Sequence, residues 1–489
     1  MDKFKTVDRK TGYLLPPSVE DWLEQDHVAR FIVEVIDQLD LTNLTRQYTG
    51  RGSQAHHPAT LLGILVYGYC TGIFSSRKLE RATYDSVAFR YIAAGSHPDH
   101  DTLASFRKRF LGELDGLFVQ VLRVAQEMKL LKLGTVCLDG TKIHANASRH
   151  SALSHGHIEK LEVQLKAEVA ELFALAEAAD QTSVPDGVSL PEEIKRREDR
   201  LAAMAQAKTK IAARVAERDA QEKQEYERKM TERAARQEGA GKDDDKGSGK
   251  KLGGKPPQEP QPGPRPGDQI NLTDEESRIM PVSGGGFEQA YNAQVAVDAA
   301  TMLVIATGVT QAPNDKQQVV PMLQTLAAHA NRATEAVPAP GASATDAPAT
   351  DAPATAAPAH GVVTHLIADT GFYSEANILA CEAANIEPLI AVARDAHHPG
   401  WRERHSEPAP LPANATTAQA MSHKLKTKAG RALYALRKQT VEPVFGIIKS
   451  VMGFRQFSLR GLRKVAGEWT LVCLAWNLKR MASLRLQFA

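Results

Sequence analysis

The chain has 489 residues and a formal net charge of only +2, with 43% hydrophobic, 24% charged and 6% aromatic residues. This length suggests several structural units, and this composition is typical of globular proteins rather than collagenous or membrane-spanning ones. The four cysteines are Cys70, Cys137, Cys381 and Cys473, and none belongs to a CxxC pair. They favour a reducing compartment over a disulfide framework or a structural zinc site.

The amino-terminal part of the chain, residues 1–130, has the apolar spacing of helices. Its longest apolar stretch, 59–74, is short for a membrane span, and the chain does not open like a signal peptide. We therefore expect an all-helical domain, a cytoplasmic location and no membrane partner. A basic helix with Arg107 and Lys108 is expected near the end of this domain.

Residues 131–150 follow with the first strand pattern of the chain. A short apolar run is stopped by Asp139 and Gly140, which predicts a buried strand that ends at an acid. Lys142 and His144 then alternate with small or apolar residues, which indicates an extended segment with one polar face. This polar face is either a DNA contact or only the wet side of a strand.

Two stretches interrupt the strand pattern. Residues 151–237 are charged, alanine-rich and helical in period, which predicts an antiparallel hairpin of coiled-coil character. That hairpin is either an arm that contacts DNA or a partner, or a solvated insertion. Residues 238–270 are rich in Gly, Lys, Asp and Pro and residues 333–360 in Ala and Pro, so both are expected to be linkers, the first of them disordered.

The remaining segments, 271–332 and 361–489, alternate between strand and helix patterns. A strand in the second segment ends at Asp369, and helices follow it. With the two interruptions removed, the order begins with antiparallel hairpins and continues with alternating strands and helices. This order predicts an α/β core with a mixed sheet and helices on both faces.

Charge is unevenly distributed along the chain. Residues 421–489 contain fourteen lysines and arginines but only two acids, Glu442 and Glu468. Aromatic residues are interleaved with these bases, which favours a folded segment over a basic tail. A basic surface of this kind indicates a polyanionic partner, most simply nucleic acid.

Three acids form the candidate site. Asp139 and Asp369 each end a predicted strand, and Glu442 lies on a late, basic helix. Adjacent carboxylates repel each other, and a divalent cation with a preference for hard oxygen ligands, such as Mg²⁺ or Mn²⁺, removes that conflict. Pro443 directly follows the glutamate, so we expect the helix to kink there or to begin anew.

These residues and their contexts resemble the DDE transposases of bacterial insertion sequences, over most of the chain outside the two linkers. The matching pieces are SSRKLE at 75–80, PDHDTLASFR at 98–107, LDGTK at 138–142, YNAQ at 291–294, ADTGFY at 368–373, EPVFG at 442–446 and WNLK at 476–479. The family signature spaces a Tyr, an Arg, a Glu and a Lys by two, three and six residues. Glu442 and Lys449 obey the last interval, whereas Tyr434 and Arg437 are each displaced by one position and Lys438 stands where the arginine is expected.

The resemblance implies a ribonuclease H-like core with a five-stranded mixed sheet, in which Asp139, Asp369 and Glu442 are catalytic and bind two magnesium ions, for which manganese can substitute. It implies cleavage of double-stranded DNA at the terminal inverted repeats and transfer of the 3′ end into target DNA, by a homodimer on DNA. The residues expected to contact DNA are Lys449, Lys438, Arg437, Tyr434, Lys142, His144, Arg107 and Lys108. Asp315 is either a further acid of this site or an acid at a helix amino terminus.

Two alternatives remain open at this point. One is a metal-dependent DNA nuclease that cuts without joining, and strand-transfer assays separate it from a transposase. The other is a catalytically inactive derivative that still binds DNA, which the intact acids argue against. A purely structural coiled-coil protein does not explain strands that end in acids.

Overall fold

A computed structural model of the protein describes residues 18–48, 54–177, 189–240, 256–282, 284–334, 362–393, 406–412 and 414–488. The chain divides into two compact units. The first consists of Met1–Asn146 and Ile279–Ala489, and the second of Ala147–Arg278. The expected linker at 333–360 lies outside the described residues apart from its first two positions.

The amino-terminal part of the first unit is helical, as its periodicity predicts. Its helices are α1 (Val19–Trp22), α2 (Val28–Ile36), α3 (Thr42–Thr45), α4 (Pro58–Thr71), α5 (Ser76–Asp85), α6 (Val87–Ile92), α7 (His100–Arg109) and α8 (Leu114–Glu127). Helix α4 starts with a proline, whose missing N–H costs nothing there, and ends at Gly72 with φ +82°. Most of its residues are buried, so it is the central helix of this part. No single helix within the described ranges has the length and apolarity to cross a membrane, and only the bent pair α4–α5, at 96°, has them in combination.

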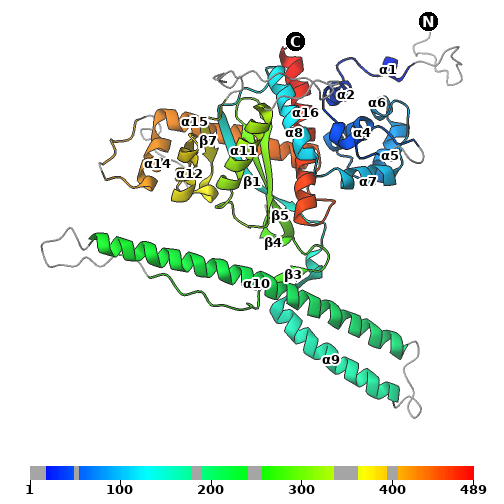
Figure 1. Ribbon diagram of the computed structural model, residues 1–489, viewed down its shortest axis with the longest axis vertical. Helices are drawn as coiled ribbons and strands as arrows, with labels where there is room; N and C mark the ends of the chain where they lie inside the picture. The colour runs from blue at the N-terminus through cyan, green and yellow to red at the C-terminus, as the bar shows by residue number, and fades with distance from the viewer. Residues whose placement is uncertain are drawn as a thin grey trace, which may run out of the picture. The chain divides into compact units, whose positions relative to one another are not determined.

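The core of the first unit is one mixed sheet (Figure 1). Its strands are β1 (Thr135–His144), β4 (Arg278–Pro281), β5 (Phe287–Asp298), β6 (Val304–Thr310), β7 (His365–Ala368) and β8 (Glu387–Ile390). The order is β4-β5-β1-β7-β8, and β6 also pairs with β5. Strand β1 pairs antiparallel with β5 and parallel with β7. The mixed sheet is confirmed, but it has six strands rather than five, because the short β4 also hydrogen-bonds to β5.

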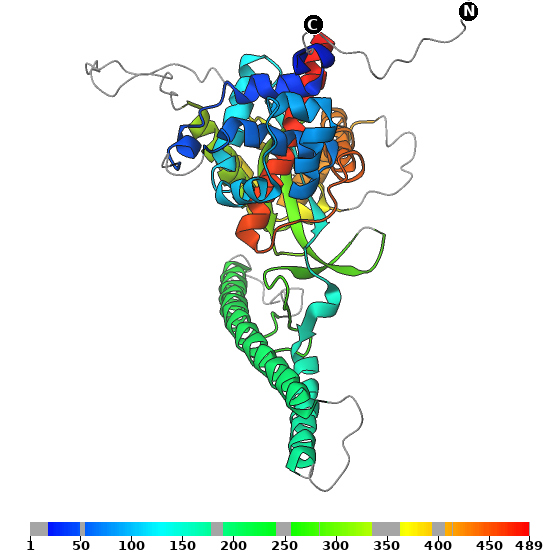
Figure 2. The same ribbon diagram turned by 90° about the vertical axis from the view of Figure 1, so that its right-hand side faces the viewer.

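Helices pack on this sheet and join it to the amino-terminal helices. They are α11 (Val319–Thr334), α12 (Glu375–Ala383), α14 (Thr417–Lys426), α15 (Lys428–Gly446) and α16 (Leu462–Phe488), with a 3-10 turn η2 (Thr370–Phe372) and a π-helical turn η3 (Ile447–Val451). Helix α16 contacts α4, α8 and β6, and both views show it among the amino-terminal helices (Figures 1 and 2). Its Asn477 side chain accepts from the N–H of Val304 and donates to the carbonyl of Val304, which covers the edge of β6.

A buried carboxylate ties the same helices to the core. Glu468 of α16 is fully buried and accepts hydrogen bonds from the Tyr69 hydroxyl at 3.0 Å and from the backbone N–H groups of Ser458 and Leu459 at 2.9 and 3.0 Å. Three donors satisfy the carboxylate, which is the condition for burying such a group. The segment after η3, helix α4 and helix α16 are therefore fixed to one another at this point.

The second unit is the predicted antiparallel helical hairpin. It contains η1 (Arg149–Ser151), β2 (Ala152–Ser154), α9 (His155–Glu177), α10 (Leu190–Ala240) and β3 (Gln269–Asn271). Apolar side chains between the helices form its core, which contains Ile158, Leu165, Met204, Ala207, Ile211, Val215 and Ile270. Ion pairs from Glu162 to Lys208 and from Glu168 to Arg197 run in opposite chain directions, as an antiparallel pair requires.

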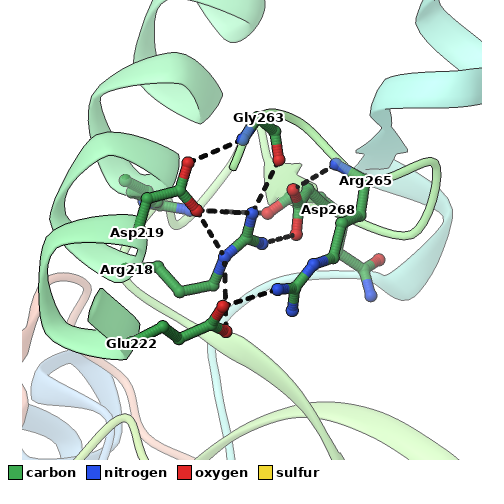
Figure 3. Close-up of polar contacts among 8 residues, drawn as sticks. Arg218, Asp219, Glu222, Gly263, Arg265 and Asp268 are labelled. Atoms are coloured by element: carbon green, nitrogen blue, oxygen red, sulfur yellow. Dashed lines mark hydrogen bonds and ion pairs between the residues drawn. The ribbon is translucent and has the colours of Figure 1, made fainter. Parts of the chain in front are cut away.

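Part of the expected disordered linker is ordered along α10. Residues 256–270 are placed, whereas 241–255 lie outside the described residues. Figure 3 shows Arg218 donating to Asp268 at 2.6 Å and to the Gly263 carbonyl at 2.9 Å, while the Gly263 N–H donates to Asp219 at 2.6 Å. The expectation of disorder is therefore wrong for this stretch, because polar side chains of α10 satisfy the backbone of a segment that has few apolar residues.

Candidate active site

Two predicted acids lie level with each other on neighbouring strands. Asp139 is in β1, and Asp369 directly follows β7, where its side chain caps η2. Strands β1 and β7 are parallel, with Cys137 opposite Ile367. Continued by two residues, this register brings the two aspartates to the same level, so their electrostatic coupling follows from the sheet itself.

The environment of Asp139 raises the pKa of its carboxyl group. The side chain is 16% exposed, and burial raises its pKa to about 6. Arg437 opposes this rise, and the negative charge of Asp369 adds to it. A nearby positive charge stabilises the ionised form of a buried carboxylate that lies next to another carboxylate.

Arg437 of α15 supplies such a charge. Its guanidinium donates to Asp139 Oδ2 at 3.2 Å, and a second nitrogen lies 3.7 Å from Glu442 Oε1. Arg437 is 16% exposed, whereas Glu442 is 53% exposed. The third acid is thus brought to the same arginine as the first, although it stays at the surface.

The helix that carries Glu442 does not break where the sequence suggested. Helix α15 runs through Pro443 as one helix, and the π-helical turn η3 follows it. Val441, Val444 and Ile448 are fully buried and form an apolar face, whereas Val451, which the spacing also predicts for this face, is 66% exposed. The expected new start is therefore wrong, because burial of this face on the sheet outweighs the loss of one backbone donor, whereas a kink at Pro443 stays a prediction.

Lys449 of η3 turns inward to the first strand. Its ammonium donates to the Thr141 hydroxyl at 2.5 Å and to the Lys142 carbonyl at 3.1 Å. Burial lowers its pKa. Two of its hydrogen bonds therefore fix the end of β1, where the sequence predicted a phosphate contact.

A second polar cluster lies beside Gly140. Asp315 Oδ1 accepts from Asn292 at 2.7 Å and from Gln294 at 2.6 Å, and it lies 3.8 Å from the ammonium of Lys142. The two amides come from alternate positions of β5, so they share one face of the strand. The Asp315 Oδ2 atom approaches Gly371, and so does Asp369 Oδ1. In the sequence, the only signal for this cluster is that polar Asn292 and Gln294 alternate with Tyr291 and Ala293. That alternation does not show that Asp315 is the residue to which the two amides donate.

Gly140 makes this cluster possible. A Cβ atom at this position would lie 2.2 Å from Gln294 Nε2 and 2.5 Å from Asp315 Oδ1. The glycine after Asp139 is therefore required by close packing over the strand. Its role as a strand terminator, which the sequence suggested, is wrong, since β1 continues to His144.

The other residues predicted to contact DNA are in different environments. Arg107 donates to the Tyr69 hydroxyl and to the Phe74 carbonyl, so its guanidinium is engaged within the helical domain. Lys108, Lys438 and His144 are exposed, and Tyr434 is partly buried. Only the exposed side chains among these present their polar atoms to an incoming ligand without rearrangement.

The three predicted acids do not form a metal cage in the described part of the chain. No group of three or more His, Cys, Asp or Glu side chains there is close enough to hold a metal ion. Carboxylates repel one another, and Arg437 lies between Asp139 and Glu442 in the place of a shared cation. The described residues do not show the convergence of the three acids within a few ångströms, which stays a prediction.

The chemistry of the donor set nevertheless fits a hard divalent cation. Asp139, Asp369 and Asp315 gather around Gly140 and Gly371, and the buried side-chain oxygens of Asn292 and Gln294 have no hydrogen-bond partner among the described residues. Carboxylate and amide oxygens are the ligands that magnesium and manganese prefer. The site can accept such an ion if Arg437 moves away from the carboxylates.

Two family matches cover separate parts of the first unit. Residues 17–109 match a transposase domain (DUF772), and residues 404–482 match a transposase DDE domain. The second match contains Arg437, Glu442 and Lys449, whereas Asp139 and Asp369 lie outside both matches. No curated protein matches the chain, and no solved structure matches it.

Proposed function

Because its two transposase domains mark the chain as a DDE transposase of the insertion-sequence kind, we propose that it cuts DNA at the ends of an insertion sequence and joins the freed 3′ ends to target DNA. Asp139, Asp369 and Glu442 are the proposed catalytic acids. One observation carries this assignment: Asp139 and Asp369 lie level with each other on adjacent parallel strands, and Arg437 links Asp139 to Glu442.

The three acids would hold two magnesium ions, for which manganese would substitute. When bound, such ions activate water or a terminal 3′ hydroxyl and stabilise the leaving oxygen. The acids act as ligands and form no covalent bond to DNA. The core would have the ribonuclease H-like fold, which the DDE match and the mixed sheet around β1 support.

Basic side chains at the site would position the DNA. Arg437 and Lys142 each lie beside a carboxylate, and both can move to a phosphate once those carboxylates have another positive partner. Each such contact neutralises one backbone charge and holds the strand in register. Lys449, by fixing Thr141, would keep the end of β1 and therefore Asp139 in place.

A strand-joining assay tests the reaction. Duplexes that end in the repeat next to the gene, cut beforehand at the 3′ end, are incubated with protein, target plasmid and Mg²⁺. The proposal predicts covalent joining of the 3′ end to the plasmid. Cutting of uncut repeats without any joining of pre-cut ends would identify a nuclease instead. A homodimer on DNA, which we also propose, predicts two repeat ends in each joining complex.

A further inference from the structure

A cavity of about 830 Å³ lies in the first unit, and none of the proposed catalytic acids lines it. Its walls come from the end of α7, the start of α8, strand β6, helix α11 and the start of α16. Because α7 belongs to the matched amino-terminal domain and α16 to the matched DDE domain, the cavity lies where these two domains meet.

The charge of this cavity is strongly one-sided. Among the described residues, five lysines and arginines line it, and Asp115 is the one carboxylate. Asp115 is already engaged, since His329 lies 3.2 Å from it and Arg332 forms an ion pair with it. Hydrogen bonding by His329, and then by Arg332, lowers the pKa of Asp115 to about 2. The remaining cations are not balanced by any carboxylate of the lining.

Of these remaining cations, Arg109 forms side-chain hydrogen bonds within the described part of the chain and the other three do not. Arg109 donates to the side chain and the carbonyl of Gln47 and stacks 5.2 Å above the Tyr48 ring. Lys108, Arg463 and Lys464 are exposed, and within the described residues none of them forms an ion pair or a side-chain hydrogen bond. Three cations from two helices therefore face the same cavity with their charges unpaired.

Hydroxyls and glycines also line the cavity. The hydroxyls of Thr307 and Thr470 lie 3.2 Å apart there, and Gly308 and Gly467 add no side chains. Small residues let a ligand come close to the backbone, and hydroxyls are common partners of phosphate oxygens.

We propose that this cavity binds the sugar–phosphate backbone of duplex DNA away from the catalytic acids, with Lys108, Arg463 and Lys464 as the phosphate contacts. The inference rests on the proposed function, because it assigns the chain's DNA to this surface. One DNA segment bound here contacts both matched domains, so it would set the position of the helical domain relative to the core. Phosphate contacts position the duplex and do not read its sequence.

Salt dependence of binding tests the proposal. The triple variant K108A/R463A/K464A and the full-length wild type are titrated with a labelled duplex of about 30 base pairs in rising NaCl. Each lost phosphate contact reduces the slope of log K against log salt by about 0.9. The proposal predicts a slope shallower by roughly two to three, on repeat and on unrelated duplex alike. An unchanged slope would overturn it.

A matched control removes the same charge elsewhere. In the triple variant R81A/K166A/R228A, each lost cation is exposed and already pairs with a carboxylate on its own helix. This control should keep the wild-type slope, and a slope as shallow as that of the cavity variant would overturn the proposal. Matching thermal unfolding of both variants and the wild type shows that neither is misfolded.

Two further outcomes separate the possible failures. If polyglutamate binding depends on the cavity cations and DNA binding does not, the surface accepts an acidic protein and the proposal is overturned. If the wild type joins DNA ends while the cavity variant binds DNA with the wild-type slope, the cavity proposal alone fails. If the wild type neither cuts nor joins repeat DNA, the proposed function fails with it.

Discussion

Arg437 and Asp139 form an ion pair at 3.2 Å, although 297 residues separate them along the chain. The same guanidinium lies 3.7 Å from Glu442. A single positive charge therefore serves two of the proposed metal ligands, in a place where a divalent cation would otherwise balance them. This relationship makes Arg437 a competitor of the cation as well as a candidate DNA contact.

Removal of this charge should strengthen cation binding. We expect Arg437→Gln to bind Mn²⁺ roughly tenfold more tightly, because a like charge a few ångströms away costs about 1–4 kcal/mol. Isothermal titration calorimetry in the absence of DNA measures this. Arg431→Gln is the control on the same helix, since Arg431 donates to the backbone carbonyls of Lys426 and Ser406. Weaker binding by Arg437→Gln would show that the arginine does not compete.

The raised pKa of Asp139 predicts a pH-dependent cost in stability. Its folded pKa, about 6, lies above the ordinary 3.8. Between these values the folded state keeps a proton that the unfolded state loses, so stability falls as pH rises through this window. At pH 7.5 the free energy of unfolding of Asp139→Asn should therefore exceed that of wild type by about 2–3 kcal/mol, and below pH 4 the two should be equal. Urea denaturation at several pH values measures this.

Asp115 should give the opposite pH dependence of stability in the same experiment. Its pKa is lowered to about 2 by His329 and Arg332, so its contribution is present at neutral pH and disappears as pH falls through the range below 4. Asp115→Asn should destabilise the protein at pH 7.5. If Asp139→Asn also destabilises it there, burial does not dominate the environment of Asp139.

Gly140 should tolerate no side chain. Gly140→Ala places a methyl group 2.2 Å from Gln294 and 2.5 Å from Asp315, which should cost about 1–3 kcal/mol of unfolding free energy. Gly116→Ala is the control, because a Cβ there meets nothing within 4 Å and alanine favours the interior of α8 by about 1 kcal/mol. Equal changes of unfolding free energy for the two variants in urea denaturation would mean that Gln294 and Asp315 move aside at little cost.

The buried Glu468 should be among the most sensitive positions. Glu468→Ala leaves three donors without a partner, and we expect a loss of at least about 3 kcal/mol. Tyr69→Phe removes only one of the three hydrogen bonds and should cost about 1 kcal/mol. Chemical denaturation orders the two variants. A Tyr69→Phe loss as large as that of Glu468→Ala would show that the backbone donors contribute little.

Local patterns were enough to predict the framework of the site. A short apolar run that reaches an acid predicted β1 and β7. Each signal lies within about ten residues of sequence, so it does not depend on contacts with distant segments.

Contacts between distant segments were beyond such patterns. Lys449 obeys a spacing that suggested a phosphate contact, yet its partner is Thr141, about 300 residues away in strand β1. Arg437, displaced from the expected signature position, is the residue that reaches Asp139. Pro443 stays inside its helix because tertiary burial outweighs its local preference. In each case the deciding energy comes from residues hundreds of positions away or from packing against the sheet.

The most direct test is the cleavage of DNA that carries the terminal repeat by Glu442→Gln, with Mg²⁺ and with the product ends mapped. Wild type should release a 3′ hydroxyl at the repeat end and join it to target DNA. Glu442→Gln should lose at least about a hundredfold of this activity, since it removes a proposed metal ligand. Glu407→Gln, an exposed acid outside the site, should remain active. Cleavage by Glu442→Gln at the wild-type rate would contradict the assignment of the three acids.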